Sequence, residues 1–180
     1  MGLLDVFRSI FSGGGSSAYP DPVAPSPQVQ QEQRAALAAA EGSGSYDDIM
    51  RAISDLDSIA WLWDECEAAY QRAFERFPDQ KGNTAMFTAQ TLYLGTAGYK
   101  AKIADTAKAD TYERALKWYL VASQNGERSQ GLNYVEMCEW LESKPEFRAR
   151  AQPWVERFEA AFPGDEYSGR MASLRAKFAS

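Results

Sequence analysis

The chain contains no histidine among its 180 residues. Histidine is the commonest general base and the commonest transition-metal ligand, so its absence excludes Ser-His-Asp and Cys-His catalysis and histidine-based zinc sites. Carboxylate sites for magnesium or calcium remain open. The densest acidic cluster, Asp64, Glu65 and Glu67, would need carboxylates from another helix to hold such an ion, and a solvated helix face is the simpler interpretation. We therefore expect no enzymatic activity, no cofactor and no metal ion.

Cysteine is scarce, with Cys66 and Cys138 far apart in the sequence. Two cysteines at this spacing suggest neither a zinc site nor a disulfide framework. Each lies within a helical pattern, which favours a small buried hydrophobic residue at both positions.

Basic residues are too few to balance the acidic ones, since the net charge is -6 and the sequence pI is about 4.8. A nucleic-acid-binding domain needs a basic patch that neutralises phosphates, so we expect no nucleic-acid partner. The acidic balance fits solubility, and it also fits a basic protein partner.

The N-terminal segment, residues 1–12, is too short to span a bilayer and lacks the features of a secretory signal. Its large apolar residues recur at the spacing of one helical face: Leu3, Leu4, Phe7, Ile10 and Phe11. This pattern predicts a short amphipathic helix that docks in a groove on a partner protein or on a membrane surface. Arg8 is its only positive side chain, which favours the protein groove. We expect a cytoplasmic protein, free or peripheral to a membrane or an assembly.

Three further regions follow this segment. Residues 13–27, rich in Gly, Ser and Pro, predict a tether that is flexible at first and then extended. Residues 28–45 predict an accessory helix, with little to bury besides Val29 and Leu37, and a Gly-Ser stop. Residues 46–180 predict the folded domain.

The domain shows no strand pattern, so we expect an all-α fold. Apolar residues predict one helical stripe from Ile49 to Phe77, ending before Pro78. Further helices are predicted after Gly82, from Tyr112 to a C-cap at Asn125 and Gly126, and over 132–141, 153–162 and 167–178. Such helices, joined by short turns, indicate hairpins stacked as a short repeat-like solenoid or as a bundle.

Two stretches resemble known repeat families. Cys66, Tyr70, Ala73 and Pro78 fall where a tetratricopeptide repeat places a small residue, an aromatic, an alanine and the terminating proline. A second stretch resembles one Sel1-like repeat and comprises Leu94-Gly95, Tyr99, Ala115-Leu116-Lys117-Trp118-Tyr119, Ala122 and Gly126. It departs from that pattern, because the part between Gly95 and Trp118 is about one helical turn too long and lacks the usual glycine-rich turn. A generic helical bundle is the alternative.

The resemblance implies a scaffold whose concave surface binds a peptide or protein. Trp61 and Trp63 are two positions apart and cannot share one helical face, so one of them, beside Asp64, offers a partner surface unless both are covered. The sequence thus predicts a non-enzymatic adaptor recruited through its N-terminal helix. The alternative is an acidic inhibitor or immunity protein that neutralises a basic toxin.

Overall fold

The computed structural model describes residues 26–57, 63–98 and 103–179, and these contain helices but no strand. The all-α prediction is therefore confirmed for the described residues. The predicted N-terminal helix, most of the tether and Trp61 lie outside them. The elements, in chain order, are α2 (Pro27–Ser43), α3 (Tyr46–Asp57), α4 (Trp63–Arg76), the 3-10 helix η2 (Pro78–Gln80), α5 (Lys81–Gly98), α6 (Asp105–Gln124), α7 (Gly131–Glu142), α8 (Arg148–Ala161) and α9 (Ser168–Phe178).

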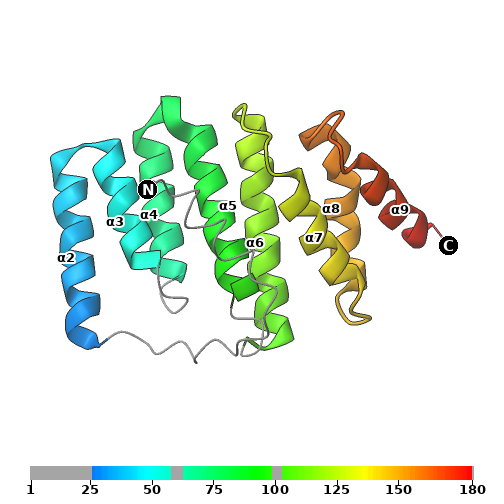
Figure 1. Ribbon diagram of the computed structural model, residues 1–180, viewed down its shortest axis with the longest axis horizontal. Coiled ribbons are helices and arrows are strands. Elements are labelled where there is room, and N and C mark those ends of the chain that lie inside the picture. The colour runs from blue at the N-terminus through cyan, green and yellow to red at the C-terminus, as the bar shows by residue number, and fades with distance from the viewer. Residues whose placement is uncertain (1–25, 58–62, 99–102, 180) are drawn as a thin grey trace, which may run out of the picture.

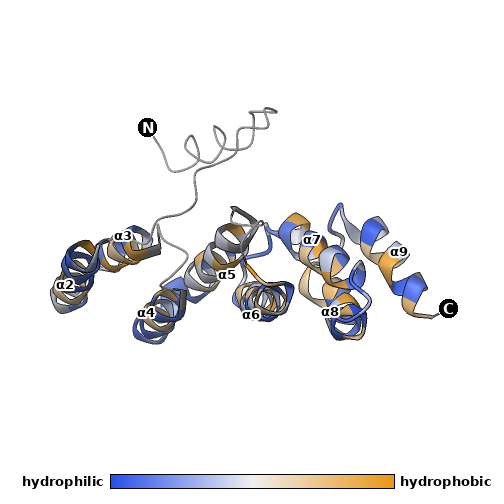
Figure 2. Cartoon of the chain, turned by 90° about the horizontal axis from the view of Figure 1, so that it is seen from below, coloured by the Kyte–Doolittle hydropathy of each residue, from blue (hydrophilic) through white to orange (hydrophobic). Residues whose placement is uncertain are grey.

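The helices stand side by side in one row from α2 to α9, with successive helices running in opposite directions (Figure 1). Seen along the helices, the row is staggered: α3, α5, α7 and α9 lie on one side, and α4, α6 and α8 on the other (Figure 2). Each helix packs mainly against its neighbours in the chain. The arrangement is an open stack of helix pairs.

Two apolar clusters form the interior, and α4 joins them. The first cluster lies within α2, α3 and α4 and includes Leu37, Ile49, Ile53, Leu56, Cys66 and Tyr70. The second lies within α5 to α9 and includes Leu92, Leu116, Tyr119, Tyr134, Met137, Phe158 and Phe162. Phe74 of α4 packs against the second cluster, with its ring edge-on to Trp118 at 5.7 Å between centroids.

Helix ends follow from local chemistry. Phe77 precedes Pro78 and leaves the helical conformation with φ -120°, which ends α4 as predicted. The C-cap Asn125 ends α6, and Gly126 after it takes a φ of 91°, again as predicted. Gly82 lies in the first turn of α5, where an added Cβ would come within 2.6 Å of the Asn125 carbonyl oxygen. This close approach brings the start of α5 against the end of α6.

The prediction of one continuous helical stripe from Ile49 to Phe77 was wrong. α3 ends at Asp57, α4 begins at Trp63, and the two helices pack against each other. Both halves of the stripe face the same apolar cluster, because Ile53 of α3 and Tyr70 of α4 are buried together. Two helices that bury their apolar faces in one cluster have the same sequence pattern as one longer helix.

The predicted start of the next-to-last helix at Pro153 was also wrong. α8 begins at Arg148, so Pro153 lies in its second turn, where it is exposed. Proline lacks an N–H and so removes one hydrogen bond from the helix. Packing of Ala151, Val155 and Phe158, all fully buried, holds the helix on both sides of that gap.

Four buried tyrosines predict a loss of stability in alkali. Burial raises the pKa of Tyr112 to about 12. It raises the pKa values of Tyr93, Tyr119 and Tyr134 further. The pKa of a tyrosine in the unfolded chain is about 10. Above that value the unfolded chain releases protons that the folded chain retains, so the free energy of unfolding falls as pH rises.

Thermal melts followed by circular dichroism between about pH 8 and pH 11 measure this effect. The melting temperature should be flat below about pH 9 and should fall above pH 10. Tyr134→Phe should make the fall less steep, because it removes one of the retained protons. A melting temperature that stays constant up to pH 11 contradicts the prediction.

Candidate functional site

Arg114 and Trp118 of α6 bind the carboxylates of Asp64 and Glu67 on α4, and these four side chains are called here a clamp. Arg114 Nη2 contacts Asp64 Oδ1 at 2.8 Å, and Arg114 Nε donates to Glu67 Oε2 at 2.7 Å. Trp118, one turn further along α6, donates its indole N–H to Glu67 Oε1 at 2.7 Å. Both Glu67 oxygens are therefore engaged, and its side chain is only 24% exposed. A half-buried carboxylate held by a guanidinium and an indole is a strong and directional link.

The same clamp recurs between α8 and α6. Arg150 Nη2 lies 2.6 Å from Asp110 Oδ1 and 2.6 Å from Glu113 Oε2. Trp154, one turn further along α8, approaches Glu113 Oε1 with its indole nitrogen at 3.5 Å. The hydrogen bonds to Glu113 and Asp110 raise the pKa of the Arg150 guanidinium. Thus α6 and α8 each present an arginine and a tryptophan to an acidic pair on the α-helix two places earlier in the chain.

The clamps mark a repeat that the sequence reasoning missed. The stretches 64–70, 110–116 and 156–162 each carry an acidic residue first, a glutamate fourth and an alanine sixth. Their third, sixth and seventh residues are all buried. The signal was present in the sequence, but it is only seven residues long and its apolar positions vary in size. The three stretches lie on α4, α6 and α8, which occupy one side of the stack.

The predicted partner surface at Trp61, Trp63 and Asp64 is accounted for only in part. Trp61 lies outside the described residues, and Trp63 is the first residue of α4. The Asp64 carboxylate is 91% exposed, yet it is paired with Arg114. Asp64 thus takes part in the clamp, and the surface formed by the two tryptophans stays a prediction.

An aromatic cluster with a buried lysine links α5, α6 and α7. Tyr112 lies edge-on to Trp140 at 5.3 Å, and the Lys108 ammonium lies over the Trp140 ring at 4.4 Å. Lys108 is only 4% exposed, and aromatic faces stabilise such a desolvated cation. On the same side of the stack Tyr93 donates a hydrogen bond to Glu136. These contacts hold α7 to the α5–α6 pair.

Helix α5 has an unusual surface composition. No residue from Gly82 to Gly98 is charged, and none from Lys81 to Gly95 is exposed. Every other described α-helix exposes at least one charged residue. α5 packs closely along α4 and α6. It meets α3 and α7 at separate points, through the hydrogen bonds of Asn83 with Tyr46 and of Tyr93 with Glu136. Its least covered side is a line of half-buried residues, called here the α5 strip: Asn83, Phe87, Gln90 and Leu94.

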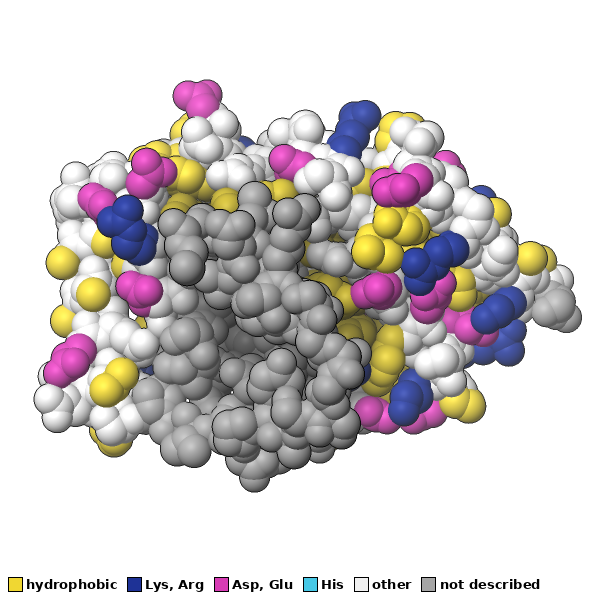
Figure 3. Space-filling model, in the orientation of Figure 1, with side chains coloured by type: hydrophobic (Ala, Val, Ile, Leu, Met, Phe, Trp, Pro, Cys, Tyr) yellow, Lys and Arg dark blue, Asp and Glu magenta, His cyan; other side chains and the backbone are white. Residues whose placement is uncertain are grey.

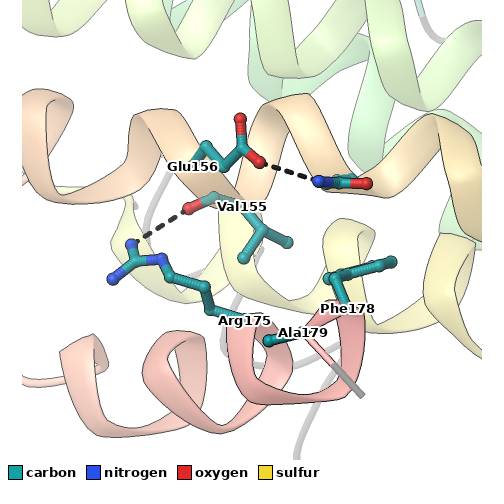
Figure 4. Close-up of a pocket in the computed structure, with 6 residues that line it drawn as sticks. Val155, Glu156, Arg175, Phe178 and Ala179 are labelled. Carbon is teal, nitrogen blue, oxygen red and sulfur yellow. Dashed lines mark hydrogen bonds between the residues drawn. The ribbon is translucent and has the colours of Figure 1, made fainter.

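A shallow cavity lies between α8 and α9 (Figure 4). Its polar groups are already engaged, because Arg175 Nη2 donates to the Val155 carbonyl at 3.3 Å and Gln152 Nε2 donates to Glu156 Oε1 at 2.9 Å. The lining residues include no Ser, Thr, Cys or Lys, and the carboxylate of Glu156 accepts the hydrogen bond from Gln152. The cavity offers no chemistry of its own.

Among the described residues, no three His, Cys, Asp or Glu side chains are grouped closely enough to hold a metal ion. Cys66 and Cys138 are fully buried, as the sequence predicted, and burial raises the pKa of the Cys138 thiol. None of the helices in the described ranges is both long and apolar enough to cross a membrane. No protein-family model, curated protein or solved structure matches this chain.

Trp118 should contribute strongly to stability. Trp118→Ala removes a side chain that is only 7% exposed and leaves Glu67 without its indole donor. We expect the free energy of unfolding to fall by about 3–5 kcal/mol, as urea titration would measure. Lys117→Ala changes the exposed neighbouring residue and should alter it by less than about 0.5 kcal/mol. Similar midpoints for the two variants would show that Trp118 is not a core residue.

The clamp should show energetic coupling in a double-mutant cycle. The cycle uses Arg114→Met, Glu67→Gln and the double variant. We expect the coupling free energy between the two side chains to be about 1–3 kcal/mol. Arg34 and Glu65 provide the control, because this pair has bidentate geometry but side chains 46% and 44% exposed. Solvent screening should make its coupling clearly smaller. Equal coupling in the two pairs would show that burial adds nothing to the clamp.

Proposed function

We propose that this chain is a non-enzymatic adaptor, in which a stack of helix hairpins binds a protein partner and residues 1–12 recruit it to an assembly. The α5 strip is the observation that supports a binding role most directly. An uncharged line of side chains on one side of an acidic, helical stack is suited to apolar contact with another helix. The resemblance of Leu94 to Gly126 to a Sel1-like repeat supports the same role.

The distribution of charge disfavours the alternative, an acidic inhibitor of a basic toxin. Such an inhibitor needs carboxylates that are available to its partner, whereas many carboxylates here pair within the chain. Arg170 pairs with Glu139 at 2.5 Å, and Lys177 pairs with Glu142 at 2.7 Å. Figure 3 shows acidic and basic side chains next to each other over the C-terminal helices. An exposed pair of this kind lowers the local negative potential that would steer a basic protein.

Substitution within the N-terminal segment tests the proposal. Phe7→Glu places a charge at the centre of the apolar stripe formed by Leu3, Leu4, Phe7, Ile10 and Phe11. Recruitment of the full chain to its assembly should be lost, while the melting temperature of the domain stays unchanged. Co-purification from the native source, compared by quantitative mass spectrometry, measures recruitment.

Val29→Glu is the matched control, because Val29 is an apolar residue of α2 that is 41% exposed. This variant should keep every partner of the parent chain. The adaptor proposal is contradicted if Phe7→Glu keeps the same partners as Val29→Glu. Recovery of a basic toxin by both variants would favour the inhibitor instead.

A further inference from the structure

We propose that the α5 strip is the docking surface for residues 3–11 of the same chain. The proposed function assigns these residues to a partner, and this inference adds where they bind when the partner is absent. This inference rests on the proposed function only for the identity of the partner that displaces residues 3–11. The α5 strip and the N-terminal segment would then form an intramolecular contact that a partner must compete with.

The chemistry of the α5 strip calls for an uncharged, apolar occupant. Phe87 and Leu94 supply apolar surface, and Asn83 and Gln90 are neutral. A charged side chain placed here would lose hydration without meeting an opposite charge on α5. Within the described residues, α4 and α6 pack most closely along α5. The strip itself is covered in part, because Asn83 Nδ2 donates to Tyr46 Oη of α3 at 3.2 Å and Phe87 packs against the first apolar cluster.

Residues 3–11 have the complementary composition. Their apolar side chains fall on one helical face, and Asp5 and Arg8 fall on the opposite face, where they would remain in water. As a helix this segment would be about 13 Å long, and the part of α5 from Asn83 to Leu94 is about 17 Å long. A helix this short is marginal alone in water, because nucleation is costly, and it gains stability when its apolar face is covered.

The connecting chain is long enough for the contact. Residues 12–26 can span about 50 Å when extended and about 20 Å on average when flexible. Helix axes pack about 8–10 Å apart, so α5, three places from α2 in the row, lies within reach. A tether of this length gives an effective concentration in the millimolar range. This concentration favours the chain's own segment over a free second copy.

Labelling of an introduced thiol tests the contact in the purified full chain, with no partner present. Gln90→Cys places the thiol on the α5 strip, while the native Cys66 and Cys138 are fully buried and react slowly. Gln124→Cys places the control thiol at an exposed position of α6. The probe is a fluorescent maleimide, and the labelling rate is the readout.

We expect Phe7→Glu to increase the labelling rate at position 90 by at least about tenfold, because an open state that is rare in the parent becomes dominant. The rate at position 124 should not change. Val29→Glu should leave both rates as they are in the parent. Circular dichroism melts of all variants check that the domain remains folded.

Three outcomes would overturn the inference. Equal rates at position 90 with and without Phe7→Glu would show that residues 3–11 do not cover the α5 strip. The strip would be assigned to a second copy of the chain by three results together. Phe7→Glu would increase the labelling rate at position 90, the parent chain would be labelled more slowly as protein concentration rises, and light scattering would show a dimer. An increased rate in Val29→Glu as well would show a general loosening of the fold. None of these results depends on recruitment, so the inference and the proposed function can fail separately.

Discussion

The carboxylate of Glu67 is the point on which the cohesion of the stack depends. It lies where two apolar clusters meet, and it accepts hydrogen bonds from both Arg114 and Trp118 of the next helix pair. The other links across this junction are apolar, such as the contact of Phe74 with the second cluster, and polar, such as the Tyr70 hydroxyl and Thr91 Oγ1 at 3.2 Å. A half-buried charge stabilises the fold most when both donors are in place, because they replace the water it has lost. Removing either donor would therefore cost more than the bond itself.

Repetition of the clamp explains how an open stack holds together without one central core. α6 supplies the arginine and tryptophan for α4 and the acidic pair for α8, so each link shares a helix with the next. In such stacks stability is close to a sum of terms for each unit and for each interface between neighbours. A weakened clamp at Glu67 would then lower the interface contribution between α4 and α6, and a weakened clamp at Glu113 that between α6 and α8.

Helix positions could be predicted from the sequence where a single local signal determined them. Pro78 ends a helix by restricting the backbone of the residue before it, and Gly126 does so by adopting a positive φ that other residues rarely take. The break between α3 and α4 could not be read from the pattern, because both helices contribute to one apolar cluster. The clamps were missed for a related reason. A glutamate among other acidic residues looks like a solvated face, and only the position of α6 shows that Glu67 receives two donors.

Packing within the described residues accounts for the uncharged surface of α5 only in part. Ala85 and Ala89, both fully buried, already provide the small surface that lets a neighbouring helix approach. Asn83, Phe87, Gln90 and Leu94 are half-buried, so the contacts of Asn83 with Tyr46 and of Phe87 with the first apolar cluster leave part of this line uncovered. The other described α-helices of this acidic chain each expose charge, whereas a charge on this half-buried line would lose part of its hydration. The absence of charge along this one line is most simply explained by a contact that excludes charge, and residues 3–11 are the part of the chain whose composition matches such a contact.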